Sequence, residues 1–427
     1  MKLGIGQAVL TPPIGTPLAG FGFRDHGSEG VLDDLEAKVL WFQDGESAEE
    51  AVCIVTADIL GFGPSVVEDI LGTLSREHGI PPERVLLAAS HTHSGPQIDD
   101  LVIGTGATVP EVVAMIRDKI IAAVGTARND LQPVVLHAGT GICEGFAINR
   151  RHSANGRVEM APNPNGPRDD KVTAIVCRND SDGRVRAVLF HFTCHPSTIG
   201  SYLVTADYPG VARRHIEKSL GNGAVAAFLP GCCGDVRSYC TVMGGKTFRS
   251  GTPEDINAFG TALGTEVVNI VRHAMEPVTP RLSAKKISVD IPLAQHPSRK
   301  ELETLTRKGD ALEKAWAWSI LSKPFSNVRS FYIQRIDLAK EVTLMAMSGE
   351  VCSEYGHFVR KLRPNSYTVP LGYSNGVIGY IPTAAMFPEG GYEPDRSSVY
   401  YGLPSPFTPE LEWIIQSGLR RMMNDDC

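Results

Sequence analysis

Short apolar runs alternate with amphipathic stretches in the first part of the chain. Apolar runs at 51–60 and 84–90 predict strands, and the helical periodicity of 64–77 and 111–128 predicts helices. Two strands separated by a helix are typical of a parallel βαβ unit. We therefore expect an α/β fold with a mixed, largely parallel central sheet flanked by helices. In such sheets, functional residues gather at the carboxyl ends of the strands.

The rest of the chain continues this alternation. Strand patterns dominate 134–192, interrupted by a polar stretch at 149–170 that predicts a long loop. Further strands are expected at 187–198 and 341–350, and at 224–236 a strand that runs into a glycine turn. Helices are expected at 205–220, 254–274 and 299–321, and a last one after Glu350 that ends at Lys361. There is no internal repeat, low-complexity tract or obvious linker, so we expect a single compact catalytic domain over residues 1–427.

Composition narrows the class of protein. The 427 residues are 42% hydrophobic with a net charge of −7, and no basic stripe occurs, which argues against nucleic acid or an anionic membrane as a partner. No stretch approaches the roughly 18 apolar residues of a membrane span, and the N-terminus lacks a signal-peptide pattern. The nine cysteines are scattered without a C-x-x-C pair. We therefore expect a cytoplasmic protein that acts on a small molecule.

Several strand patterns end in polar residues followed by Gly or Pro. In "LLAASHTHSGP", His91 and His93 lie two residues apart, so in extended backbone both imidazoles would face one spot. That arrangement suits a metal site or an acid–base pair, but a purely structural role is also open. His195 and Glu350 end two other apolar runs. Two histidines from different strands and a carboxylate match the ligands of a catalytic zinc.

Five motifs and the N-terminal segment occur in an order that resembles the neutral/alkaline ceramidase family. The motifs are "HTHSGP", "HFTCHPST", "GCCGDV", "SGE" and "NGVIGYIPT…EGGYE", and the opening segment is "GIGQAVLTPPIGTPLAGFG". The resemblance covers nearly the whole chain. It implies a catalytic zinc bound by His91, His195, Glu350 and Tyr380, with His93, Arg150 and Tyr392 contacting the reacting group. It also implies amide hydrolysis by metal-activated water.

The chain departs from the family pattern at two places. Arg237 follows "GDV" where the ceramidases have a serine, and after "IPTAAMFPEGGYE" we expect no C-terminal immunoglobulin-like domain of the kind that they carry. Arg237 would suit a polar or anionic substrate, and Arg151 is a second candidate for holding a substrate anion. Alternatively, Arg237 pairs with an acid such as Asp235. We expect a zinc-dependent hydrolase that cleaves an amide bond of a small polar molecule; the alternatives are an ester or lactone hydrolase, or a metal-binding protein without turnover.

Other residues carry weaker predictions. Asp58 could orient a zinc histidine from behind, as carboxylates often do. Asp207 is either a helix N-cap or a second acid behind the site. Trp316 and Trp318 lie two apart in a helical stretch, so they cannot both be core, and one is expected to line a pocket or the interface of a homo-oligomer.

Overall fold

A large sheet forms the centre of the molecule. In this computed structural model, residues 1–99, 102–154 and 156–424 are described. The predicted domain over 1–427 also includes residues outside those ranges. The sheet order is β12-β10-β9-β6-β1-β3-β4-β5, with β16 beside β6. The strands are β1 (Lys2–Val9), β3 (Glu36–Gln43), β4 (Val52–Ala57), β5 (Val85–Ala89), β6 (Gln132–Ile142), β9 (Lys171–Asn179), β10 (Val185–Phe192), β12 (Val225–Pro230) and β16 (Met275–Pro277).

This sheet is mixed, and the prediction that it is largely parallel is not confirmed. The predicted βαβ unit forms, because β4 and β5 pair in parallel, as do β10 and β12. The pairings of β1 with β3, β3 with β4, β6 with β9 and β9 with β10 are antiparallel. The continuous apolar runs that predicted parallel strands arise instead because these strands are buried on both faces of the sheet.

A second sheet covers one face of the first and accounts for that burial. Its order is β17-β18-β19-β21, with strands β17 (Pro280–Pro292), β18 (Val328–Ala339), β19 (Val342–Met347) and β21 (Tyr367–Leu371). Within β4, Val52 and Ile54 join the core between the two sheets, whereas Cys53 and Val55 join the core beneath the helices. Alternate residues of one strand therefore serve two apolar cores.

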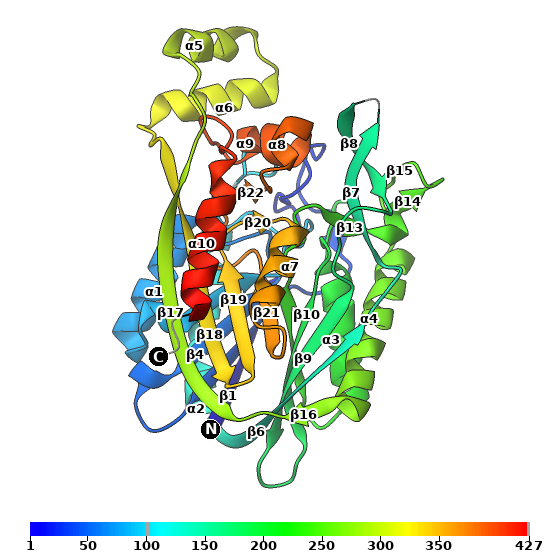
Figure 1. Cartoon of the computed structure of the whole chain (residues 1–427), viewed down its shortest axis with the longest axis vertical. Coiled ribbons are helices and arrows are strands. Elements are labelled where there is room, and N and C mark those ends of the chain that lie inside the picture. Colours follow the sequence, from blue (N-terminus) through cyan, green and yellow to red (C-terminus); the bar gives the residue numbers. More distant parts are fainter. Residues whose placement is uncertain (100–101, 155, 425–427) are drawn as a thin grey trace.

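Helices enclose the two sheets (Figure 1). The helices α2 (Pro110–Asn129) and α4 (Pro253–His273) contact strands of the first sheet, and α1 (Pro64–His78) and α3 (Asp207–Leu220) pack beside them. On the second sheet, α10 (Glu410–Asn424) lies along β17 and β18, and α7 (Ser353–Leu362) contacts β21. The architecture is thus helices, sheet, sheet and helices in successive layers. In the described part of the chain, no helix is long and apolar enough to cross a membrane.

Two predicted elements differ from the structure. The helix expected at 299–321 is a hairpin of α5 (Arg299–Lys308) and α6 (Ala311–Ser322), because the chain turns at Gly309 and Asp310 begins a new capping box with Glu313. This hairpin projects beyond the ends of β17 and β18 (Figure 1). Likewise, the polar stretch at 149–170 is not a loop throughout: it contains most of a hairpin of β7 (Ala147–Ala154) and β8 (Arg157–Asn163).

Short elements complete the chain. They are β2 (Gly30–Val31), η1 (Ala48–Glu50), η2 (Pro82–Arg84), β11 (Leu203–Val204), β13 (Val236–Ser238), η3 (Tyr239–Thr241), β14 (Val242–Met243), β15 (Thr247–Phe248), β20 (Glu350–Val351), β22 (Tyr380–Ile381), α8 (Met386–Glu389), the π-helix η4 (Tyr392–Arg396) and α9 (Ser397–Tyr400). Two of the resulting pairings position the candidate site. The strand β13 pairs with β7, and β20 pairs in parallel with β22, which sets Glu350 opposite Tyr380.

Candidate metal centre

Three histidines from two strand ends converge in the structure. His91 and His93 follow β5, and His195 follows β10; their nearest nitrogens all lie within 4.8 Å of one another. Although β5 and β10 are far apart in the sheet order, residues of β5 contact β12, the neighbour of β10. The curling of the sheet thus brings the two strand ends together.

The convergence of His91 and His93 was predicted, but the backbone achieves it differently. The strand β5 ends at Ala89, and His91 has a φ of +68°, in the left-handed region that few residues with a side chain adopt. The Nε2 atoms of His91 and His93 nevertheless lie 3.3 Å apart. Non-glycine residues in this region are concentrated at functional sites, where the surroundings enforce them.

Each histidine has its Nδ1 next to a backbone carbonyl. The partner is the oxygen of Leu60 for His91 at 2.5 Å, of Gly20 for His93 at 3.0 Å, and of Cys233 for His195 at 2.7 Å. Carbonyl oxygens only accept, so each Nδ1 carries the proton and each Nε2 keeps a free lone pair. Burial lowers the pKa of His195 to about 4 and that of His93 well below its ordinary value, which keeps both rings neutral.

Two of the three lone pairs, those of His91 and His195, meet a carboxylate. The Nε2 atoms of His91 and His195 are 3.2 Å apart, and Glu350 Oε2 lies 3.2 Å from the first and 3.1 Å from the second. Electron pairs held this close repel one another unless a cation lies between them. Imidazole nitrogens with a carboxylate oxygen are the donor set that Zn²⁺ prefers in catalytic sites. These residues therefore fit a bound metal ion.

Tyrosines surround Glu350. The hydroxyl of Tyr401 donates to Glu350 Oε1, and that of Tyr373 donates to Oε2 at 3.4 Å. The ring of Tyr373 also packs on His91, with centroids 4.2 Å apart. Tyr380, predicted as the fourth ligand, has its ring parallel to that of His195 at 6.5 Å, and burial raises the pKa of its hydroxyl. Tyr380 thus lies beside the cluster, and its role as a ligand stays a prediction.

The two neighbouring arginines predicted for the site share one acid. Arg150 Nε donates to Glu393 Oε1 at 2.8 Å, and Arg151 Nη1 donates to Oε2 at 2.6 Å. Arg151 is further bound to Glu389 and to the carbonyl oxygen of Gly390, and it is absent from the lining of the site cavity. Arg150 does line the cavity, and its buried Nη2 has no hydrogen-bond partner among the described residues.

Arg237 is not paired with Asp235. The carboxylate of Asp235 accepts from Asn149 Nδ2 at 2.9 Å and from Ser353 N and Oγ at 2.7 and 3.0 Å. The guanidinium of Arg237 lies instead over the ring of Phe248, 4.9 Å from its centre, and lines the site cavity.

The two other acids have structural partners. Asp58 accepts from Glu36 N at 2.9 Å and pairs with Arg213 at 2.8 Å. It was expected to orient a zinc histidine, but the Nδ1 atoms of His91 and His195 are bound to backbone carbonyls instead. Asp207 begins α3, and its carboxylate accepts from the N–H groups of Tyr208 and Thr198 at 2.7 and 2.8 Å. It therefore fastens the segment that follows His195 to the start of the helix.

A cavity of about 250 Å³ connects these groups. Its lining residues include His91, His93, Arg150, Arg237, Glu350, Tyr380, Tyr392, Tyr400 and Tyr401. Sequence reasoning missed Tyr401, Tyr373, Glu393 and Gly20. Glu393 directly follows Tyr392 in the "GGYEP" motif, and this position was a usable signal. Gly20 has a φ of +91°, and a Cβ at this position would clash with the ring of His93. Nothing in the sequence marked the two tyrosines.

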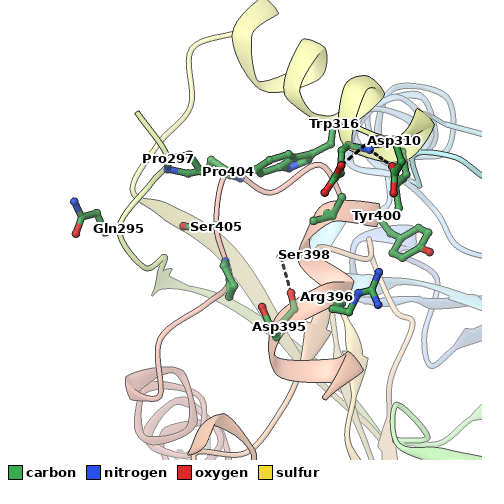
Figure 2. Close-up of a pocket in the computed structure, with 14 residues that line it drawn as sticks. Gln295, Pro297, Asp310, Trp316, Asp395, Arg396, Ser398, Tyr400, Pro404 and Ser405 are labelled. Carbon is green, nitrogen blue, oxygen red and sulfur yellow. Dashed lines mark hydrogen bonds between the residues drawn. The ribbon is translucent and has the colours of Figure 1, made fainter. Parts of the chain in front are cut away.

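A second pocket, of about 290 Å³, lies between α6 and the segment around α9 (Figure 2). Tyr400 lines both this pocket and the site cavity. Trp316 forms part of its wall and donates from Nε1 to Leu403 O at 2.7 Å. Trp316 is 7% exposed and Trp318 63%, so the expectation that only one of them is core is confirmed.

The fold and the histidine cluster are those of an α/β protein with a candidate metal site at the ends of its strands. Comparison with known proteins gives its family. Residues 1–255 match the family of neutral/alkaline non-lysosomal ceramidases, N-terminal part. The chain belongs to this family. The neutral ceramidase of Pseudomonas aeruginosa is 23% identical over 305 residues, which cover 68% of this chain and 44% of that protein. The aligned part therefore spans less than half of that relative.

Solved structures show the same fold. The chain superposes on the crystal structure of neutral ceramidase from Pseudomonas aeruginosa with a TM-score of 0.78 and 18% identity, covering 99% of this chain and 74% of that one. A ceramidase complexed with C2 gives a TM-score of 0.79 at the same identity and coverage.

Proposed function

We propose that this protein is a zinc-dependent hydrolase that cleaves an amide bond of a small polar molecule. The observation that carries the proposal is the convergence of three histidine side chains, two of which, His91 and His195, have their Nε2 atoms within 3.2 Å of Glu350 Oε2, with each Nδ1 fixed on a carbonyl. Carbonyl-fixed imidazoles are typical of metal ligands. Membership of the ceramidase family supports the amide as the bond cleaved.

In this proposal His91, His195 and Glu350 hold the metal, and Tyr380 completes the set. When bound, zinc supplies a water of lowered pKa and polarises the substrate carbonyl. Tyr401 and Tyr373 hold Glu350 from both oxygens, which fixes the direction of its lone pairs. The histidines and Glu350 are already positioned without a substrate, so the site is preorganised.

His93, Arg150 and Tyr392 act on the substrate. His93 is neutral, its Nδ1–H is fixed by Gly20, and its Nε2 faces the cluster, so this nitrogen can take a proton from the attacking water and return it to the leaving amine. Arg150 lines the cavity, and its Nη2 has no hydrogen-bond partner among the described residues. Burial raises the pKa of Tyr392, which keeps its hydroxyl a donor. Both can stabilise the charge that develops on the carbonyl oxygen.

The cavity supports a compact substrate. Its volume of about 250 Å³ is below the roughly 300–1,000 Å³ of pockets that hold drug-sized ligands. Ester or lactone hydrolysis would use the same groups, but the family favours an amide. A metal-binding protein without turnover would need neither His93 nor Arg150 in the cavity. We also propose a cytoplasmic location, which the free cysteines of the described residues support.

Metal content and hydrolysis test this function together. The purified protein should bind about one zinc per chain by elemental analysis. It should hydrolyse short N-acyl amides, lose activity to a chelator and regain it with zinc. A fluorescent short-chain ceramide assayed beside polar amides compares the two substrate classes directly. The proposal fails if zinc-loaded protein hydrolyses none of the amides. Efficient cleavage of ceramide alone would overturn only the polar substrate.

A further inference from the structure

The side chain of Arg237 is half-buried beside the site, and no acid among the described residues compensates its charge. Its Nε is inaccessible to solvent and has no hydrogen-bond partner, and no carboxylate of the described residues forms an ion pair with it. Its contact with the ring of Phe248 holds it in place without neutralising it. Burial, and next the charge of Arg150, lower its pKa to about 10, so the group stays charged at neutral pH.

The small sheet of β13, β7 and β8 directs this charge into the cavity. Arg237 pairs with Ile148, which lies two residues before Arg150 on β7, so the two arginines come from neighbouring strands. Both line the cavity. Glu393 compensates Arg150, but no carboxylate of residues 1–99, 102–154 and 156–424 compensates Arg237 in the same way.

The cavity is consequently basic. Glu350 is the one carboxylate among its described lining residues, and that carboxylate faces the histidine cluster. A divalent cation at the cluster would add further positive charge. Partly removing a cation from water without giving it a partner costs free energy, and a ligand that supplies an anion offsets that cost.

We infer that the substrate carries a carboxylate, which Arg237 binds through the paired N–H groups of its guanidinium. The inference rests on the proposed function, because it names the class of amide that the same site accepts: an amide with a carboxylate on its acyl or its amine part. Arg237 thereby selects the substrate and leaves the chemistry to the histidine cluster.

Three compounds of similar size test the inference. N-propylhexanamide is neutral, N-hexanoylglycine carries a carboxylate on the amine part, and N-propyladipamic acid carries one on the acyl part. Binding is measured by calorimetry in a His93→Ala background, which slows turnover, and kcat/KM is measured in the active protein. At least one acid should bind about 10- to 100-fold more tightly than the neutral amide, as expected for a charge-assisted hydrogen bond.

Variants assign that preference to one residue. R237Q should abolish it and leave the affinity for N-propylhexanamide within about threefold, whereas R237K should retain part of it. R157Q is the matched control, because Arg157 is an exposed arginine on the same small sheet that does not line the cavity.

The outcomes separate this inference from the proposed function. Equal binding of all three compounds, or a preference that survives in R237Q, would overturn the carboxylate site. If all three were hydrolysed equally, with no change in R237Q, amide hydrolysis would stand without the carboxylate site. Arg237-dependent binding of an acid without hydrolysis of any compound would support the site and count against the proposed hydrolysis.

Discussion

The two cavities that Tyr400 lines have similar volumes, but they differ in whether their polar groups are hydrogen-bonded to other protein groups. In the larger one, of about 290 Å³, polar groups are already engaged: Asp310 and Glu313 cap α6 reciprocally, and Ser398 donates to Asp395 O (Figure 2). Trp316 donates to Leu403 O. In the smaller one, of about 250 Å³, the histidine Nε2 lone pairs face one another and Glu350, and Arg237 Nε has no hydrogen-bond partner among the described residues. Polar groups that stabilise a fold are hydrogen-bonded to one another, whereas polar groups left unpaired at a buried site are available to bind a ligand.

The largest expected effect comes from removing the carboxylate of the cluster. Glu350→Gln replaces an anionic donor by a neutral amide, so zinc affinity should fall by more than about 100-fold, beyond the loss expected for a partner of a ligand. Zinc titration with a competing chelator measures this, and hydrolysis should fall in parallel. Glu313→Gln, in the larger pocket, is the control and should bind zinc as before. Unchanged zinc affinity in Glu350→Gln would mean that the cluster is not the metal site.

His93→Ala distinguishes a proton-transfer residue from a metal ligand. If His93 acts on the substrate, the variant should keep its zinc and lose about 100-fold in kcat, the usual contribution of a general acid–base group. Its Nε2 lies 3.3 Å from that of His91, so the geometry also permits a third histidine ligand. Loss of zinc in the variant would assign it to the metal. His296→Ala, a histidine bonded to Ser405 beside the larger pocket, should change neither quantity.

The sequence predicted the residues of the cluster better than the frame that holds them. His91, His93, His195 and Glu350 were identifiable because each follows an apolar run, and strand ends gather functional groups. The strand pairing was not identifiable, because a strand covered by helices on one face and by a second sheet on the other reads like a strand of a parallel sheet.

Tyr401 shows a further limit of sequence reasoning. It lies 51 positions from Glu350 and donates to it, a contact that depends on how the segment after η4 folds back over the cavity. The same holds for the pairing of Asp235 with Ser353, 118 positions away, which makes Asp235 a partner of Ser353 and not of Arg237. Partners this distant follow from tertiary packing and leave no local pattern.

Tyr401→Phe should have an intermediate effect. It removes the hydroxyl that donates to Glu350 Oε1 and leaves the ring in place. Loss of such a partner of a ligand costs about 10- to 100-fold in metal affinity, so we expect a fall near the lower limit. Tyr400→Phe is the neighbouring control, and its zinc affinity should stay unchanged. Equal effects of the two variants would mean that the donation to Glu350 contributes nothing specific.

The smallest effect should come from the larger pocket. Asp310→Ala removes the N-cap of α6, whose side chain accepts from Glu313 N at 2.8 Å, and this should destabilise the helix by about 1 kcal/mol. Hydrogen exchange of the α6 amides measures the loss directly, because the α5–α6 hairpin projects beyond the sheets and can open without the rest of the fold. Since the cap lies outside the site cavity, zinc affinity and kcat/KM for a small amide should stay within about twofold of the unaltered protein. A fall in kcat/KM with zinc still bound would show that α6, through the wall that Tyr400 shares, shapes the substrate site, and the two cavities would then have to be treated as one.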